Sequence, residues 1–259
     1  MISDYDYFKA KILKLTGFDL NSYKEQQIRR RLGSLMQSLG VDSFSQYYQI
    51  LEKNPQHLDA FFRRVTINVS EFFRNPERFQ ELSQVHLPAL LAKNSLPRIW
   101  SAGTSTGEEA YTLAIILLEL VPRYRGTILA TDIDQEALDF AAAGVYPPGR
   151  LRCLPPGYRE KYFLPAGDNY RVKDRVKSLV TLRRHDLLRE PFPGTYDLIL
   201  CRNVVIYFTE KAKERLYKQF FQALNPGGIL FTGATEQIFN SRQLGFTNLS
   251  PFFYQRPER

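Results

Sequence analysis

From about Leu96 onward, short apolar runs alternate with amphipathic stretches, and this alternation restricts the fold more than any other feature. The apolar runs are bounded by glycine or polar turns and cover 98–102, 127–131, 179–182, 196–201 and 228–233. Helical stretches follow at 107–121, 135–143 and 210–224. Strands that alternate with helices form βαβ units, in which helices cover both faces of a parallel sheet. We therefore expect an α/β fold with an open, mostly parallel sheet.

Two regions do not follow this alternation. Residues 145–178 are rich in Pro, Gly, Arg and Tyr, which indicates an inserted β-subdomain built as a small antiparallel sheet. The first seventy residues show only helical spacing of apolar side chains, as in Ile28, Leu32 and Leu35. We expect a helical domain over 1–70 and a second domain over 71–259.

The net charge of +8 and the pI of about 9.4 are the unusual numbers of the composition, since 44% apolar and 24% charged residues are ordinary for globular proteins. A basic excess suggests a nucleic acid or another acidic partner. Two cysteines cannot form a disulfide framework, and no metal site is expected. The first residues lack a signal peptide's features, and the apolar stretch 110–121 is too short to span a membrane. We expect a cytoplasmic location.

The sharpest local signal is the small-residue loop Gly103–Gly107, which lies between a predicted strand and a predicted helix. It matches the G-x-S-x-G pattern of a hydrolase nucleophile elbow. A hydrolase also needs an acid followed by a histidine, and the one histidine after Ser105 is His185 at a strand end. A dinucleotide site is equally disfavoured, because G-x-G-x-x-G is missing and Glu108 and Glu109 would repel a pyrophosphate.

A third interpretation uses these acids. S-adenosylmethionine carries an amine and a sulfonium and no phosphate, so carboxylates suit it. Asp132 ends the second predicted strand and could accept hydrogen bonds from ribose hydroxyls, while Asp186 follows the third and could approach the adenine amino group. Open parallel sheets bind ligands at the carboxyl ends of their strands. The alternative is that these acids are ordinary helix-start and turn residues.

Several sequence blocks together resemble one family, the chemotaxis receptor methyltransferases (CheR). The order and spacing of the blocks match over nearly the whole chain, at Thr66–Arg74, Trp100–Tyr111, Ala130–Asp134, Cys201–Phe208 and Pro226–Gly228. The resemblance implies a Rossmann-like S-adenosylmethionine-dependent methyltransferase sheet with an inserted β-subdomain and an N-terminal helical domain that recognises receptors. It further implies methyl transfer to glutamate side chains of chemoreceptors, giving glutamate methyl esters and S-adenosylhomocysteine.

The resemblance also implies roles for individual residues. Arg74 and Tyr207 would lie nearest the transferred methyl group. Arg29, Arg30 and Arg31, on the basic second helix, would meet the acidic methylation region of a receptor. The cofactor would be bound by Asn68, Ser70, Arg74, Gly103, Glu109, Asp132, Asp186, Leu187, Cys201 and Arg202.

Two features depart from familiar family members. Residues 33–38, which follow the arginines, carry no charge, so the basic face of this helix is shorter. The loop around 167–169 in the β-subdomain is also short, whereas members that bind a receptor's C-terminal tether carry a longer one. We therefore expect tether-independent binding.

The proposed chemistry agrees with these residue types. A glutamate carboxylate has an ordinary pKa of about 4.3, so it is ionised at neutral pH and needs no strong general base. The protein must supply alignment of the reacting atoms. Arg74 could orient the carboxylate by a bidentate fork, and Tyr207 could border the methyl group, unless it is a core aromatic.

The expected partners are cytoplasmic helices of chemotaxis receptors, without nucleic acid or membrane insertion, and the protein is expected to be a monomer. A nucleic-acid methyltransferase remains an alternative because of the charge and the shared fold, although 202–205 lack the N/D-P-P-Y/F motif of amino-methylating enzymes. A non-catalytic scaffold that binds S-adenosylmethionine is a further alternative.

Overall fold

The computed structural model describes residues 3–66 and 70–258. The chain divides into two compact units. The helical unit comprises Met1–Ile67 and Tyr207–Arg215, and the sheet unit comprises Asn68–Ile206 and Leu216–Arg259. The chain thus contributes a second, distant segment to the helical unit before it returns to the sheet unit.

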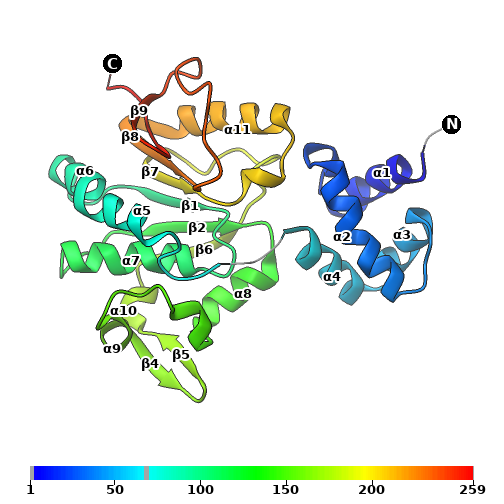
Figure 1. The fold of residues 1–259 in the computed structure, drawn as a ribbon, viewed down its shortest axis with the longest axis horizontal. Helices are drawn as coiled ribbons and strands as arrows, with labels where there is room; N and C mark the ends of the chain where they lie inside the picture. Colours follow the sequence, from blue (N-terminus) through cyan, green and yellow to red (C-terminus); the bar gives the residue numbers. More distant parts are fainter. Residues whose placement is uncertain (1–2, 67–69, 259) are drawn as a thin grey trace. The chain divides into compact units, whose positions relative to one another are not determined.

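The helical unit is built from four α-helices, as the spacing of apolar residues predicts (Figure 1). These helices are α1 (Asp4–Thr16), α2 (Glu25–Ser38), α3 (Phe44–Lys53) and α4 (Pro55–Thr66), with a 3-10 turn, η1, at Leu20–Ser22. The buried ring of Phe8 joins three of them, since its centroid lies 5.3 Å from Phe44, 5.8 Å from Tyr47 and 6.2 Å from Phe61. Aromatic packing of this kind compensates for the small size of the unit.

A seven-stranded sheet forms the centre of the other unit (Figure 1). The strands are β1 (Ile99–Ala102), β2 (Ile128–Asp132), β6 (Val180–Arg184), β7 (Tyr196–Cys201), β8 (Leu224–Thr232), β9 (Thr247–Ser250) and β10 (Phe253–Gln255). Their order is β6-β2-β1-β7-β8-β10-β9. All neighbours from β6 to β8 are parallel, and β10 is antiparallel to both of its neighbours. The predicted parallel sheet is confirmed.

Helices cover both faces of this sheet. The elements are α5 (Pro76–Glu81), η2 (Leu82–His86), α6 (Leu87–Lys93), α7 (Glu108–Leu120), α8 (Gln135–Ala143), η4 (Val205–Tyr207) and α11 (Glu210–Ala223). Alternation along β1 separates the faces: Ser101 donates a hydrogen bond to Glu109 of α7, whereas the ring of Trp100 lies 5.8 Å from Phe220 of α11. None of the helices among the described residues has the length and apolar character needed to cross a membrane.

The predicted β-subdomain is also present. A three-stranded antiparallel sheet contains β3 (Val145–Tyr146), β4 (Phe163–Ala166) and β5 (Asn169–Val172), beside η3 (Pro148–Leu151), α9 (Tyr158–Tyr162) and α10 (Asp174–Lys177). Because Ala166 is opposite Asn169, a two-residue turn joins β4 to β5, and Gly167 supplies its positive φ of 61°. The ring of Phe72 packs on Tyr146 and Phe163, which ties the subdomain to the segment before α5.

Candidate active site

The carboxyl ends of four of the five parallel strands, β6, β2, β1 and β7, bring the predicted acids to one edge of the sheet. Ala102 is opposite Thr131, and Asp132 is opposite Arg184. His185 N–H donates to the carbonyl of Asp132 at 2.9 Å, so the turn that carries Asp186 follows directly beside the end of β2. Sequence-distant residues therefore share one edge, as the parallel topology requires.

Hydrogen bonds attach the loop between β1 and α7 to the end of β2. The N–H groups of Gly103 and Thr104 both donate to the carbonyl of Thr131, each at 2.8 Å. Gly103 has a φ of 82°, and a Cβ at this position would lie 2.4 Å from Cγ2 of Val204. Gly103 is thus needed because the turn after β7 passes directly against the loop.

Asp132 is a predicted cofactor residue whose two carboxylate oxygens are both held by backbone N–H groups. Its Oδ2 accepts from Ser105 N–H at 2.7 Å, and its Oδ1 accepts from Asp134 N–H at 3.0 Å. Burial raises the pKa of this carboxyl group to about 6. At pH 7 it is ionised, and each oxygen still has a lone pair for a ligand hydroxyl.

Glu109 lies in the first turn of α7 and connects β1 to Arg202. Its Oε1 accepts from Ser101 Oγ at 2.8 Å, and its Oε2 is 3.6 Å from Arg202 Nη1. Burial raises the pKa of Glu109 and lowers the pKa of Arg202, while each charge opposes the shift of the other. A half-buried carboxylate and a buried guanidinium therefore hold one another beside the glycine loop.

Arg202 also holds the segment that contains Arg74. Its Nη2 donates to the Arg74 carbonyl at 3.0 Å and to Oδ1 of Asn75 at 2.9 Å. The guanidinium carbon lies 4.8 Å from the ring centroid of Phe79 and 4.7 Å from that of Phe231. Through Nη2 and its ion pair with Glu109, Arg202 joins the Arg74 backbone to the edge that carries Glu109.

Three further predicted cofactor residues lie at the same edge. Asp186 Oδ1 accepts from Leu188 N–H at 2.8 Å, and burial raises the pKa of Asp186. Leu187 is buried, and so is Cys201 at the end of β7. Burial and nearby carboxylates raise the pKa of the Cys201 thiol, so it stays protonated and offers an uncharged surface.

Ser70 and Arg74 are half-buried and line one hollow, whereas Asn68 lies outside the described residues. Between Ser70 and Arg74, Phe72 and Phe73 are buried and anchor the segment in the core. Phe73 N–H donates to Thr112 Oγ1 at 3.1 Å, which attaches the segment to α7. The backbone that presents Arg74 is therefore fixed from both sides, by α7 and by Arg202.

Sequence reasoning missed Glu236. This buried carboxylate accepts from Asn203 N–H at 2.6 Å, from Gly233 N–H at 2.9 Å and from Ile206 N–H at 3.3 Å. It therefore holds the turn after β7, where Asn203 adopts a positive φ of 60°. The rule that identified Asp132, an acid just beyond a strand end, also applies to Glu236 after β8 and could have found it.

Glu108 and Glu109 are neighbours that point to different places. Glu108 is fully buried, accepts from Thr106 Oγ1 at 2.6 Å and pairs with Arg150 Nη1 at 3.3 Å. Burial raises its pKa. The proximity of the two acids in sequence suggested a common role toward the cofactor, but only Glu109 faces Ser101 and Arg202.

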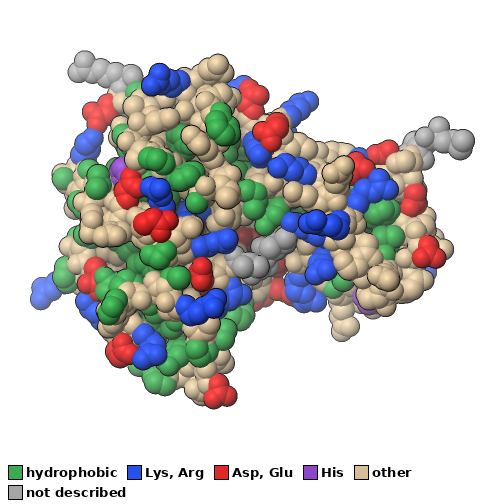
Figure 2. Space-filling view, in the orientation of Figure 1, with side chains coloured by type: hydrophobic (Ala, Val, Ile, Leu, Met, Phe, Trp, Pro, Cys, Tyr) green, Lys and Arg blue, Asp and Glu red, His purple; other side chains and the backbone are tan. Residues whose placement is uncertain are grey.

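The remaining predicted residues belong to the helical unit. Arg31 lies with its guanidinium 4.5 Å from the ring centroid of Tyr207 and donates to the Val65 carbonyl. Tyr207 is half-buried, whereas the adjacent Phe208 is the aromatic residue that is buried in the core. Arg29 pairs with Glu25 at 3.0 Å, and Arg30 is exposed. Figure 2 shows several Lys and Arg side chains over the helical unit.

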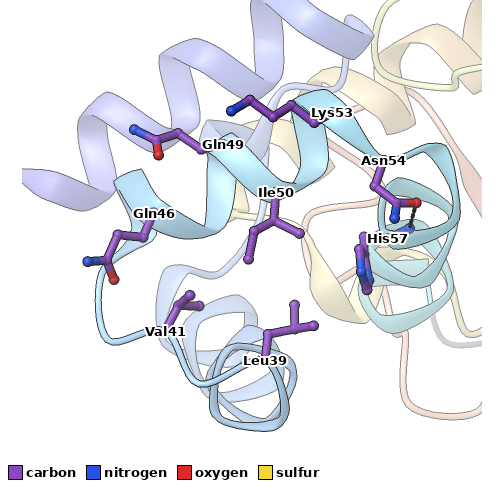
Figure 3. A pocket seen from close by; sticks show the side chains of 8 residues that line it. All are labelled: Leu39, Val41, Gln46, Gln49, Ile50, Lys53, Asn54 and His57. Carbon is purple, nitrogen blue, oxygen red and sulfur yellow. Dashed lines mark hydrogen bonds between the residues drawn. The ribbon is translucent and has the colours of Figure 1, made fainter.

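The helical unit has a hollow of its own, with a volume of about 580 Å³ (Figure 3). Leu39, Val41 and Ile50 face its interior, and Gln46 and Lys53 lie along its α3 side. No carboxylate is among the described residues that line it. The described lining of this hollow therefore offers no negative charge to a cationic cofactor.

Two family models match successive parts of the chain. "CheR methyltransferase, all-alpha domain" matches residues 3–66, and "CheR methyltransferase, SAM binding domain" matches residues 68–252. The chain belongs to the CheR methyltransferase family. The resemblance seen in the sequence blocks is confirmed, and so are the Rossmann-like methyltransferase sheet, the β-subdomain and the N-terminal helical region.

Similar proteins extend over nearly the same length. A "Chemotaxis protein methyltransferase" from Listeria monocytogenes is 39% identical over 253 residues, covering 97% of this chain and 96% of the relative. "Chemotaxis protein methyltransferase 2" from Pseudomonas aeruginosa is 34% identical, covering 96% and 92%. A "Chemotaxis protein methyltransferase" from Salmonella typhimurium is 33% identical, covering 88% and 82%.

This CheR-family protein is an S-adenosylmethionine-dependent methyltransferase, and its residues fit that cofactor. S-adenosylmethionine offers hydroxyl and amino donors and two cationic groups. The edge of the sheet supplies the complementary carboxylates Glu109, Asp132 and Asp186. Arg202 at this edge pairs with Glu109 and bonds to the Arg74 carbonyl and to Asn75, so the carboxylates favour a cationic ligand over a phosphate.

Proposed function

We propose that this protein transfers the methyl group of S-adenosylmethionine to glutamate side chains on the cytoplasmic helices of chemotaxis receptors, forming glutamate methyl esters. The observation that carries the proposal is the position of Arg74. Its backbone is held by Arg202, which also pairs with Glu109 at the edge that carries Asp132. An arginine beside an acid-lined edge suits an anionic acceptor that must meet a cationic cofactor.

The reaction needs orientation more than proton transfer. When bound, the cofactor supplies an electrophilic methyl group, which forms a bond to the carboxylate oxygen as its bond to sulfur breaks. An acceptor carboxylate with an ordinary pKa of about 4.3 is already the nucleophile at pH 7. This fits an edge where His185 is buried and has a pKa lowered by burial, so it is neutral and pairs with Glu190.

In this proposal, Arg74 receives the acceptor carboxylate through its guanidinium fork. The fork aligns an oxygen with the methyl group, and alignment of reacting groups is worth several orders of magnitude in rate. The family resemblance also assigns Tyr207 to the methyl-transfer site, and within the helical unit the guanidinium of Arg31 lies 4.5 Å from its ring centroid. Exposed Arg30 and the pair Arg29–Glu25 present the charge of α2 to an acidic receptor helix.

The test is methyl transfer from labelled S-adenosylmethionine to purified cytoplasmic fragments of chemoreceptors. Label that is released by mild base identifies a carboxyl methyl ester. Fragments in which the methylated glutamates are replaced by alanine serve as the control and should accept no label. Base-stable label, or no label on any receptor fragment, would contradict the proposal.

Two further assays on the same protein distinguish the alternative functions, a nucleic-acid methyltransferase and a non-catalytic scaffold. Salt-sensitive gel shifts with RNA or DNA, together with base-stable label on the nucleic acid, would indicate a nucleic-acid methyltransferase. Calorimetric binding of S-adenosylmethionine without transfer to any receptor fragment would indicate a scaffold. We expect binding and transfer together.

A further inference from the structure

The hollow of the sheet unit that Ser70 and Arg74 line differs in charge from the edge that carries the predicted cofactor acids. Its volume is about 440 Å³, and its lining combines the segment before α5 with η3. We name it the arginine pocket. Its lining residues are Ser70, Glu71, Arg74, Pro147, Gly149, Arg150 and Arg152.

The charge of the arginine pocket is positive. Three guanidinium groups line it, against one carboxylate, Glu71, which also interacts with the Cys153 thiol. A guanidinium has five donors in a planar fork, so it can bind a ligand carboxylate while one donor remains bonded to the protein. Arg152 is exposed and donates from Nε to the Gly149 carbonyl at 3.0 Å. Its two terminal nitrogens are the part of the side chain that suits a ligand.

Arg150 differs from Arg152 because its guanidinium is bonded to other parts of the protein. Its guanidinium donates to the Ser70 carbonyl and pairs with the buried Glu108 at 3.3 Å, and its own carbonyl accepts from Phe72 N–H at 3.0 Å. Through these contacts, Arg150 of η3 holds the backbone of Ser70–Phe72 in place. Arg150 therefore positions the wall that carries Arg74, and Arg152 offers its two terminal nitrogens to a ligand.

Exposed Gly149 leaves space in the lining of the arginine pocket for side chains that are not the protein's own. A Cβ built on Gly149 has no heavy atom within 4 Å, and Gly149 does not adopt a positive φ. The backbone conformation at position 149 therefore does not require glycine. Its lack of a side chain keeps the pocket open.

We propose that the arginine pocket binds an acidic side chain of the polypeptide substrate that lies one helical turn from the methylated glutamate. This proposal rests on the proposed function, since Arg74 lines the pocket and would hold the acceptor carboxylate. Residues three or four apart on a helix have Cβ atoms about 5–6 Å from each other. A second carboxylate on the same helix face therefore comes within reach when Arg74 holds the first, and Arg152 is the residue that binds it.

The carboxylate at Glu71 favours an acidic peptide over a nucleic acid as the occupant. A phosphate backbone brings a continuous line of negative charge, which Glu71 would repel, whereas separate carboxylates can be placed away from it. The pocket thus adds a specificity-determining residue, Arg152, and a substrate class: helices with an acidic residue one turn from the acceptor.

The test uses the full-length protein with receptor fragments and with a fluorescent, glutamate-rich helical peptide. Arg152→Glu should raise KM for the fragment by about tenfold or more through like-charge repulsion, while the Kd for the cofactor stays within about twofold. Arg152→Lys should retain most of the affinity. Arg125→Glu is the matched control, because Arg125 is exposed and precedes β2, at the opposite edge of the parallel sheet.

Two further variants locate the effect. Gly149→Leu, whose Cβ would meet no heavy atom within 4 Å, should occupy part of the arginine pocket and raise KM while preserving the melting temperature. A receptor fragment whose acidic residue one turn from the acceptor is changed to glutamine should also bind more weakly. In a double-mutant cycle, that loss should disappear in Arg152→Gln, since the two changes remove the same contact.

The outcomes separate the two proposals. Base-labile methylation with an unchanged KM in Arg152→Glu and Gly149→Leu would overturn the pocket and leave the proposed function intact. Binding of the acidic peptide that depends on Arg152, without methylation of any fragment, would overturn the function and leave the pocket. Binding of RNA that depends on Arg152, with no peptide binding, would overturn the acidic-peptide assignment.

Discussion

Two regions of the sheet unit differ in the sign of their charge and in how their side chains are held. The carboxylate edge, formed by Glu109, Asp132 and Asp186, accepts hydrogen bonds from its own backbone and from Ser101. The arginine pocket carries Arg74, Arg150 and Arg152. A cationic cofactor and an anionic acceptor need opposite surroundings, and one unit supplies both.

The boundary between the two regions runs through adjacent residues of α7. Glu109 faces Ser101 and Arg202, and Glu108 faces Thr106 and Arg150. Arg202 and Arg150 hold the two ends of the segment that presents Arg74, at Arg74 itself and at Ser70. Glu108 and Glu109 therefore serve as counterions for the arginines that fix the acceptor side.

The largest expected effect is that of Arg74→Ala on turnover. We expect kcat to fall by about 10²-fold or more, because the acceptor carboxylate loses its orientation. Cofactor affinity should change by no more than about threefold. Arg74→Lys retains the charge without the bidentate fork and should be intermediate. Single-turnover kinetics and calorimetry measure the two quantities, and unchanged kcat would remove Arg74 from the methyl-transfer site.

The next effect concerns the carboxylate edge. Asp132→Asn should weaken cofactor binding by about 30-fold, because a charge-assisted hydrogen bond of about 2 kcal/mol is lost. Calorimetric titration with S-adenosylhomocysteine measures this without turnover. Asp139→Asn is the control, since Asp139 is exposed on α8 and bonds to Gln135. Equal affinities of the two variants would contradict the role of Asp132.

The raised pKa of Asp132 makes cofactor binding depend on pH. Burial raises this pKa to about 6, so the carboxylate is ionised at pH 7 and takes up a proton as the pH falls through 6. Ligand hydroxyls need the ionised acceptor, and the cofactor Kd should rise by about tenfold between pH 7 and pH 5. The same titration of Asp132→Asn should show a flatter profile. Parallel profiles would assign the dependence to another group.

A smaller effect should distinguish the two neighbouring glutamates. Glu109→Gln should raise the cofactor Kd by about three- to tenfold, while KM for a receptor fragment changes little. Glu108→Gln should do the reverse, because it loosens Arg150 and the Ser70 segment. The loss of a buried charge pair should also lower the melting temperature of Glu108→Gln. If both variants changed the same parameter, the division of α7 between the two regions would be wrong.

Much of the sheet unit could be predicted from the chain because strands and helices have different periods. The run 196–201 became β7 with the predicted limits, and 135–143 became α8. Once the strands were parallel, the residues that follow them had to share an edge, so Asp132 and Asp186 could be placed together without any contact being known. The turn-rich composition of 145–178 likewise indicated the inserted sheet.

Side-chain direction and long-range pairing required the folded chain. Glu108 and Glu109 are equivalent in sequence, but a rotation of about 100° per residue on a helix sends them to different neighbours. Arg150 meets Ser70 across 80 positions of the chain, and Arg202 meets Arg74 across 128. No local pattern encodes such contacts.

The sequence by itself determined the class of sheet, the acids at its edge and the family of the protein, because periodicity, strand ends and ordered motifs are local properties. The tertiary structure alone decided which arginine is used to hold backbone and which faces a pocket. That distinction depends on the packing of η3 and the turn after β7 against the segment before α5, and packing between distant segments is a property of the whole fold.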